Sequence, residues 1–203
     1  MTADNPSSHR LPVHLVDDDA GVADACRYLL AELDHAVTYW SSGEAFLAGA
    51  KLDEPAIVLL DMRMPGLDGA GVHAELRQRE ACLGVIILTG HGDIDMAVEQ
   101  MKVGAIDFLQ KPVAAAALAA ALETAGQRAR QCAAERDLAH RAAALSARER
   151  EIADLICRGL TNRDIGTALS IAVRTVEVHR ARVVDKLGAT NSAELAALWQ
   201  RLQ

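Results

Sequence analysis

Acidic residues gather at the ends of two apolar stretches of this chain. Asp17, Asp18 and Asp19 directly follow one apolar stretch, and Asp61 ends a second one. Like charges at the ends of buried strands repel one another, at a high cost, unless a cation lies among them. The pattern predicts a Mg²⁺ site beside a carboxylate that accepts a phosphoryl group. Such chemistry is typical of a signalling module rather than of a metabolic enzyme.

Each polar residue at these ends suits a different chemical need. We expect Asp18, and Asp17 through water, to hold a hard cation with oxygen ligands. Asp61 would be both metal ligand and nucleophile. The turn 62–66 after it makes the backbone carbonyl of Arg63 a plausible further ligand.

Two more polar residues follow later apolar stretches. Thr89 can donate a hydroxyl hydrogen bond to a phosphoryl oxygen, and Lys111 can offset the charge of the transferring group together with Mg²⁺. Ligands bind at the carboxyl ends of the strands in a doubly wound sheet, and all five groups are expected there. One carboxylate at a strand end would mean little, but five complementary groups in this order indicate a phosphoacceptor site.

The elements that must position these groups alternate along the chain. Continuous apolar runs, typical of strands buried on both sides, occupy 13–16, 37–40, 57–60, 85–88 and 106–109. Amphipathic helical patterns lie near 21–33, 43–50, 68–79, 93–102 and 113–125. The alternation predicts an α/β fold: a five-stranded, doubly wound parallel sheet with helices on both faces.

Charge divides the 203 residues into two parts. Residues 1–124 hold 8 Lys and Arg against 19 Asp and Glu, whereas residues 125–203 hold 13 against 9. An acidic half joined to a basic half favours a regulatory module attached to one that binds a polyanion. Ordinary charge variation is the alternative. We expect a flexible tail at 1–10, an α/β domain at 11–125, a helical linker at 126–143 and an all-α domain at 144–203.

The linker is rich in strong helix formers, Ala, Arg, Gln and Glu, and we expect one long helix with a possible break near Gly126. Its leucines form only a weak heptad, so we prefer a solvated spacer to a coiled coil.

The spacing of the cysteines and the hydropathy of the chain indicate the cellular compartment in which the protein works. The four cysteines form no C-x-x-C pair, so we expect free thiols and neither a disulfide framework nor a zinc site. The longest apolar run, 113–122, is far below the ~20 residues that a membrane helix needs. We therefore expect a soluble, cytoplasmic protein with no membrane partner.

Four segments of the first half carry a family resemblance. They are 16–19 (Val-Asp-Asp-Asp), 60–66 (Leu-Asp-Met-Arg-Met-Pro-Gly), 89–93 (Thr-Gly-His-Gly-Asp) and 111–112 (Lys-Pro). Residues 11–125 thus resemble the flavodoxin-like receiver domain of two-component response regulators, especially the FixJ type. The resemblance implies phosphoryl transfer from a sensor histidine kinase to Asp61. It also implies that Thr89 and Phe108 form a switch, with a plain core aromatic as the alternative for Phe108, and a cis peptide before Pro112.

Three histidines of the first half, His35, His73 and His91, could lie either near the site or on the surface. His91, like Arg63, lies two residues after a pocket residue, where the resemblance implies an influence on how fast water reaches the phosphoryl group; a solvated side chain is the alternative. We expect His35 and His73 on the surface without partners, and Asp19 as a cap or facing solvent.

The last ~60 residues show four short helical patterns and no strand pattern. Two begin with capping-box sequences at Ser146 and Thr161. The segments 145–151, 159–166, 175–179 and 186–188 resemble the LuxR/FixJ (NarL-like) helix-turn-helix domain. The apolar stripe of the final helix, with Leu195, Leu198 and Trp199, suits a core or a dimer surface, and we prefer the dimer surface.

The second helix of the helix-turn-helix has a face short enough to enter a major groove, with basic side chains around it. The predicted DNA-contact residues are Arg174, Thr175, Glu177, Val178, His179, Arg180, Arg182 and Lys186. Two positions depart from the family pattern. Ala172 stands where a Ser or Thr cap is usual, and Glu177 stands where many relatives carry Lys, so the usual base-reading pattern is in doubt here.

These observations favour a phosphorylation-controlled transcription regulator that binds double-stranded promoter DNA and pairs into a homodimer when phosphorylated. It would not be an enzyme beyond promoting its own Mg²⁺-dependent phosphorylation and dephosphorylation. The alternatives are a phosphorylation-independent interaction module or phosphate sink, and a phosphotransfer enzyme acting on small molecules. An incomplete acidic pocket would favour the former, and no substrate-pocket motif supports the latter.

Overall fold

The computed structural model describes residues 10–90 and 94–202 and divides the chain into two compact units, Met1–Ala133 and Ala134–Gln203. Most of the predicted tail, and the predicted tuning residue His91, lie outside the described residues. No helix in the described ranges is both long and apolar enough to span a membrane.

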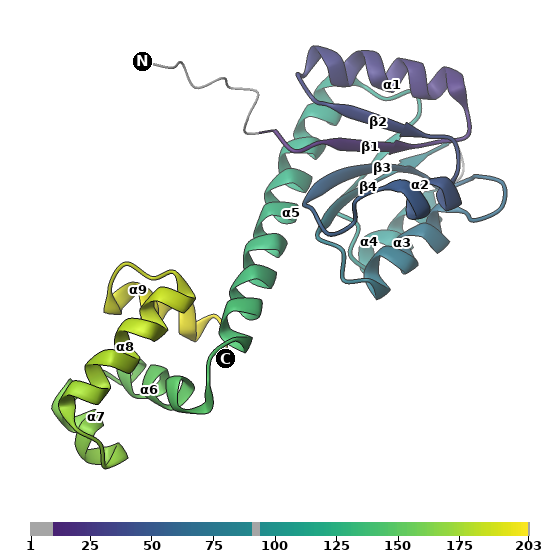
Figure 1. Cartoon of the computed structure of the whole chain (residues 1–203). Coiled ribbons are helices and arrows are strands. Elements are labelled where there is room, and N and C mark those ends of the chain that lie inside the picture. The colour runs from purple at the N-terminus through teal and green to yellow at the C-terminus, as the bar shows by residue number, and fades with distance from the viewer. Residues whose placement is uncertain (1–9, 91–93, 203) are drawn as a thin grey trace. The chain divides into compact units, whose positions relative to one another are not determined.

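The first unit is built on a five-stranded parallel sheet with the order β2-β1-β3-β4-β5 (Figure 1). The strands are β1 (Val13–Val16), β2 (Val37–Trp40), β3 (Ala56–Asp61), β4 (Leu83–Thr89) and β5 (Asp107–Gln110). The predicted fold class is confirmed. Because the pairing is parallel, the carboxyl ends of the strands meet at one edge of the sheet. Asp61 pairs with Leu88 there, and Thr89 with Gln110.

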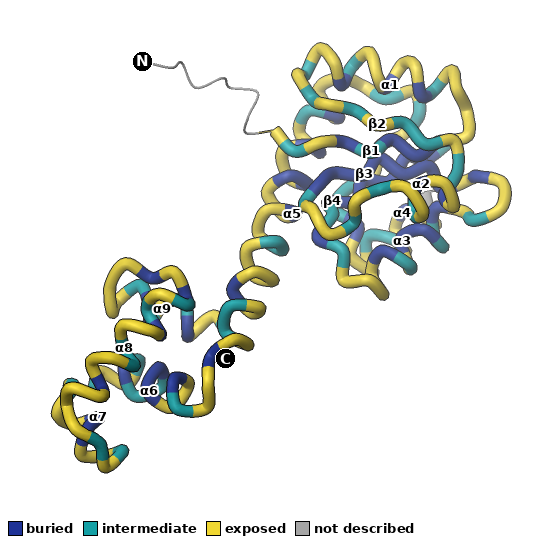
Figure 2. Tube along the Cα trace, in the orientation of Figure 1, coloured by how far each residue is buried: buried dark blue, intermediate teal, exposed yellow. Residues whose placement is uncertain are grey.

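Helices cover both faces of this sheet (Figure 1). They are α1 (Ala20–Glu32), α2 (Gly43–Gly49), α3 (Gly69–Gln78), α4 (Ile94–Lys102) and α5 (Ala115–Ala143). Alternate residues of a strand enter different cores: Leu59 packs with residues of α1 and α5, whereas Leu60 packs with residues of α2, α3 and α4. All six residues of β3 are buried (Figure 2). Its continuous apolar sequence follows from burial on both sides.

The helix that leaves the sheet is continuous through Gly126, so the possible break is not present. A glycine costs a helix about 1 kcal/mol relative to alanine. Burial of Leu122 and Ala125 in the sheet core, on either side of which the helix continues, offsets that cost. The weak heptad also has a structural reason, because Leu122 belongs to the core of the first unit and Leu138 to that of the second.

The expectation that all four cysteines are free thiols is wrong. The structure joins Cys82, just before β4, to Cys132 on α5 in a disulfide, with a Cα–Cα distance of 5.3 Å. Cys26 and Cys157 are free. The pair is separated by 50 residues and forms no sequence motif, so only the packing of α5 against the sheet brings the two thiols together.

The second unit consists of the end of α5 and the helices α6 (Ala147–Cys157), α7 (Asn162–Leu169), α8 (Val173–Leu187) and α9 (Ser192–Gln200). Both predicted capping boxes are formed, at Ser146 and Thr161. As predicted, Ala172 gives α8 no side-chain cap. The preference for a dimer surface on α9 is wrong for two of its apolar residues, since Leu195 and Trp199 are buried in the core of the unit.

Candidate functional site

Three carboxylates meet at the carboxyl edge of the sheet. Asp17 follows β1 and is fully buried, Asp61 ends β3 and is 6% exposed, and Asp18 is exposed. One oxygen atom of each lies within 4.8 Å of the others. Parallel pairing of β1 with β3 explains the approach, because Val16 lies beside Leu60 and the acidic residues come next along both strands. The expected metal residues Asp17, Asp18 and Asp61 are therefore brought together.

Lys111, which directly follows β5, also reaches this cluster. Lys111 Nζ lies 2.7 Å from Asp17 Oδ2 and 3.0 Å from Asp61 Oδ1. The backbone of Lys111 is fixed by its own N–H, which donates to Thr89 O at 2.8 Å. The peptide bond between Lys111 and Pro112 is cis, as predicted.

Burial and charge oppose each other in this cluster. Burial raises the pKa of Asp61, and the hydrogen bond and positive charge of Lys111 act against that rise. Burial by itself lowers the pKa of Lys111, but its hydrogen bonds to Asp17 and Asp61 outweigh the effect and raise the pKa. Lys111 is therefore held as a cation. One ammonium among three carboxylates leaves an excess of negative charge that a divalent cation would neutralise.

The backbone around the cluster orients two of the carboxylates. Asp19 N–H donates to Asp17 Oδ1 at 2.9 Å, and the Asp19 side chain caps α1 by accepting from Gly21 and Val22. The predicted capping role of Asp19 is thus confirmed. The backbone N–H of Arg63 donates to Asp61. Metal coordination by the Arg63 carbonyl stays a prediction.

The two expected switch residues differ in exposure. Thr89 is fully buried at the end of β4, where its hydroxyl donates to Gly90 O at 3.3 Å. Phe108 on β5 is 37% exposed and lies outside the buried cores, which speaks against the plain core alternative. The coupling of the two residues to phosphorylation stays a prediction.

Two histidines expected on the surface without partners have partners instead. His73 is buried in α3, and its Nδ1 lies 2.7 Å from Gln100 Oε1. His35 Nδ1 lies 3.0 Å from Leu11 O. Both expectations are wrong because each partner comes from a segment more than 20 residues away, and neither histidine belongs to the acidic cluster.

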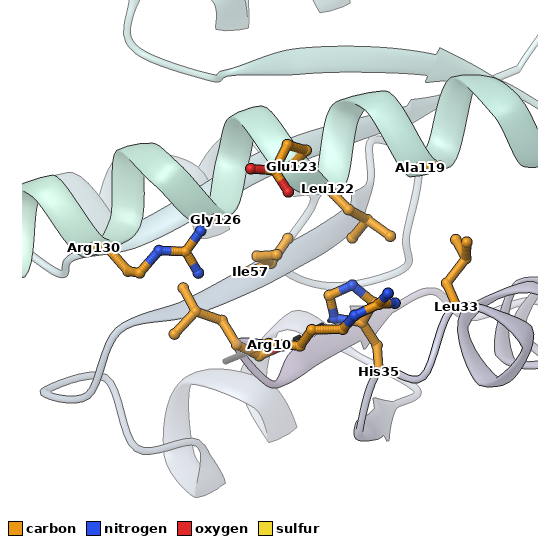
Figure 3. Close-up of a pocket in the computed structure, with 10 residues that line it drawn as sticks. Arg10, Leu33, His35, Ile57, Ala119, Leu122, Glu123, Gly126 and Arg130 are labelled. Carbon is orange, nitrogen blue, oxygen red and sulfur yellow. Dashed lines mark hydrogen bonds between the residues drawn. The ribbon is translucent and has the colours of Figure 1, made fainter. Parts of the chain in front are cut away.

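A separate pocket of about 180 Å³ lies at the opposite end of the strands. Figure 3 shows Gly126 and Arg130 of α5 facing Ile57 of β3 there, with His35 and Arg10 nearby. Ile57 is the second residue of its strand, whereas Asp61 is the last. None of the predicted site residues lines this pocket, so it is distinct from the acidic cluster.

In the second unit, the predicted DNA-contact residues of α8 separate into two groups. The exposed group consists of Arg174, Thr175, Glu177, Val178 and Arg182. Within it, Arg174 Nη1 lies 3.1 Å from Glu177 Oε2, so an arginine offsets the carboxylate that departs from the family pattern. The exposed apolar side chain of Val178, at 42%, suits contact with a thymine methyl group.

The other three predicted contacts are half-buried. Arg180 donates to Asn162 Oδ1 at 2.9 Å and also to Ser192 Oγ, which ties α8 to the starts of α7 and α9. His179 is half-buried too, and its Nδ1 is covered without a hydrogen-bond partner among the described residues. DNA contact by these side chains stays a prediction.

Lys186, the third half-buried residue, has a structural role that sequence reasoning missed. Its Nζ lies 2.7 Å from Glu149 Oε2 and donates to Ala144 O at 3.1 Å. Glu149 is 3% exposed and also closes the capping box of α6. The hydrogen bond from Lys186, followed by that of the Ser146 backbone, lowers the pKa of Glu149 to about 2. The capping-box sequence signalled the Glu149 cap, but nothing local signalled its lysine partner.

We expect Glu149→Gln to lower the free energy of unfolding of the second unit by about 1–3 kcal/mol at pH 7, because Gln keeps the cap but loses the ion pair. Since the folded pKa is lowered, this stabilisation is present above about pH 4.5 and is lost as the pH falls toward 2. The measurement is denaturant unfolding followed by Trp199 fluorescence in a Trp40→Phe background. Glu151→Gln, which removes an exposed pair with Arg148 on the same helix, is the control and should cost far less.

Comparison with known proteins gives the same division of the chain. Residues 13–123 match the response regulator receiver domain, and residues 143–199 match the bacterial regulatory proteins of the luxR family. The tetrathionate response regulatory protein TtrR of Salmonella typhimurium is 51% identical over 94% of this chain and 92% of its own length. The transcriptional regulatory protein FixJ of Azorhizobium caulinodans is 44% identical over 93% and 91%.

Solved structures agree with these relatives. The response regulator StyR is 35% identical, covers 94% of this chain and 99% of its own, and has a TM-score of 0.72. Full-length FixJ from B. japonicum is 37% identical over 94% and 96% of the two chains, with a TM-score of 0.57.

Proposed function

The chain belongs to the two-component response regulators that join a receiver domain to a LuxR-type DNA-binding domain, and we propose that Asp61 is its phosphoacceptor and Mg²⁺ its cofactor. As a member, it is a phosphorylation-controlled transcription regulator with a kinase partner and DNA as its target. The meeting of Asp17, Asp18, Asp61 and Lys111 at one sheet edge is the observation that carries the proposal.

The cluster suits phosphoryl transfer from a phosphohistidine of a sensor kinase. A carboxylate oxygen of Asp61 attacks phosphorus, a P–O bond forms, the P–N bond breaks, and the leaving imidazole takes a proton. The ammonium of Lys111 is already held in place by Asp17, so the positive charge that stabilises the transferring group is preorganised. Bound Mg²⁺ would supply further neutralisation of phosphoryl oxygens, with Asp17, Asp18, Asp61 and the Arg63 carbonyl as its ligands.

Phosphorylation of Asp61 would also change the surface and the oligomeric state of the protein. We propose that Thr89 and Phe108 link phosphorylation of Asp61 to the surface around α4 and β5, and that phosphorylated receivers pair into a homodimer. A dimer would present two copies of α8 to paired half-sites, as helix-turn-helix proteins commonly do. The exposed ring of Phe108 supports a role outside the core. We also propose a cytoplasmic location, and no catalysis beyond the chain's own phosphorylation and dephosphorylation.

Acetyl phosphate labelling combined with DNA binding tests the proposal. We expect Mg²⁺-dependent labelling at Asp61, and tighter binding of the labelled protein to a subset of genomic promoter fragments. Labelling without any change in DNA binding would favour a phosphate sink. If acetyl phosphate does not label the protein and the protein still binds DNA or another protein, the result would favour a phosphorylation-independent module.

The exposed and the half-buried arginines of α8 should behave differently. We expect Arg182→Ala to reduce discrimination between a selected site and its scrambled version by roughly 1–3 kcal/mol, as for a base-reading side chain. Arg180→Ala should weaken both complexes alike, because its guanidinium holds α8 against Asn162 and Ser192. The measurement is salt-dependent binding to both DNAs, with the site first selected from a random library. The assignment fails if Arg180→Ala alone changes sequence preference.

A further inference from the structure

The disulfide between Cys82 and Cys132 lies at the place where α5 leaves the first unit. Leu122 and Ala125 of α5 are buried in the sheet core, and the buried Ala129 and then Cys132 continue their spacing of three and four residues along the helix. The exposed residues 134–137 follow, before α5 enters the core of the second unit at Leu138. Cys132 is therefore the last side chain of this stripe, one residue before the boundary of the unit.

Cys82 lies just before β4, at a place where α5 packs directly on the strand. Cys82 lies two residues before Gly84, and a Cβ placed on Gly84 would collide with the backbone of Ala125. Absence of a side chain at Gly84 thus lets the helix backbone lie directly on the start of β4. The geometry holds α5 near enough for the two sulfurs to bond, with Cα atoms 5.3 Å apart.

We propose that Cys82 and Cys132 form a reversible redox site, whose disulfide fastens residues 126–133 of α5, the last ones within the first unit, to β4 and whose dithiol form releases them. A protein that binds promoter DNA works where thiols are kept reduced. Disulfides found in that environment are usually transient and catalytic or redox-sensing. This step uses only the DNA-binding function of the chain and is independent of which residue is phosphorylated.

The two sulfurs differ in access, which assigns their roles. Cys82 is 1% exposed, whereas Cys132 is half-buried. Cys132 is therefore the sulfur that meets an external reagent, and Cys82 is the resolving thiol.

Oxidation proceeds by exchange with a small-molecule disulfide such as oxidised glutathione. The Cys132 thiolate attacks one sulfur of the reagent, whose S–S bond breaks and releases one thiol. The Cys82 thiolate then attacks Cys132 Sγ, and the second small thiol leaves. Two protein thiols are oxidised, one small disulfide is reduced to two thiols, and the cysteine protons pass to the released thiols. An excess of small thiol drives the reverse reaction.

Equilibration of the full chain in glutathione buffers of graded ratio is the direct test. We expect the number of free thiols, counted under denaturing conditions, to fall from four to two as the buffer becomes oxidising. Cys26 and Cys157 should remain free. Peptide mapping should then identify a crosslink of Cys82 to Cys132. A pair that stays fully reduced at every ratio, or fully oxidised in excess dithiothreitol, overturns the proposal.

Hydrogen exchange tests the structural consequence. We expect the amides of 126–133 to exchange more slowly in the oxidised form than in the reduced form, because this part of α5 opens less often when it is crosslinked to the sheet. Cys132→Ser, at a half-buried position, should lose this difference; Cys82→Ala gives an independent check. Cys157→Ser, in the other unit, is the control and should keep it. A crosslink that forms without changing exchange at 126–133 rules out the fastening role.

Discussion

Asp61→Asn should abolish phosphorylation of the chain. The amide of Asn has the shape of the carboxylate but is no nucleophile toward phosphorus and a poor ligand for Mg²⁺. We expect the initial rate of labelling by acetyl phosphate to fall by at least roughly 100-fold, to the background of the assay. The fold should persist, because the change removes one of the charges that repel one another at the sheet edge, and Lys111 keeps its ion pair with Asp17.

A matched substitution two residues from the buried Asp17 separates nucleophile loss from charge loss. Asp19 caps α1, and Asn is an equally good cap, so Asp19→Asn removes a nearby charge and leaves the helix intact. Its labelling should stay close to that of the unmodified chain. The assignment is wrong if Asp61→Asn is labelled as fully as the unmodified chain and peptide mapping places the label on another residue.

The parts of the fold that depend on local pattern could be predicted from the sequence. Strand β3 is buried on both faces, and its unbroken apolar run showed this directly. Because polar groups follow such runs, the grouping of Asp17, Asp18 and Asp61 followed from parallel pairing alone. Caps are similarly local, so those at Asp19, Ser146 and Thr161 could be predicted from their sequence neighbours.

Contacts between distant segments could not be predicted in the same way. The link of Cys82 to Cys132 and the pairing of Lys186 with Glu149 join residues 50 and 37 positions apart, respectively. Each depends on how two elements pack, which no spacing rule encodes. Lys186 shows the consequence: a basic residue on the second helix of a helix-turn-helix was assigned to DNA, yet its ammonium is held by a buried carboxylate of α6. Part of the charge on such a helix thus stabilises the unit's own fold.

Asp18→Ala should remove the effect of Mg²⁺ on the receiver while leaving its fold intact. Asp18 is the exposed member of the three-carboxylate cluster and contributes charge that only a cation offsets. A ligand present at 100 times its dissociation constant stabilises the folded state by about 2.7 kcal/mol. If the loss of one carboxylate weakens binding about 100-fold, that stabilisation falls to roughly 0.4 kcal/mol. Without Mg²⁺, the variant should be at least as stable as the unmodified chain, since repulsion is relieved.

Thermal unfolding over a Mg²⁺ titration, together with labelling by acetyl phosphate, measures both effects. Asp24→Ala is the matched control, because Asp24 is an exposed carboxylate of α1 that pairs with Arg27 outside the cluster. The control should keep the Mg²⁺-dependent rise in melting temperature and the labelling. The Asp18 variant should lose most of both, whereas Asp61→Asn loses labelling by losing the nucleophile itself. If Asp18→Ala responds to Mg²⁺ as the control does, Asp18 is not a ligand, and the cation must be held by the two buried carboxylates without it.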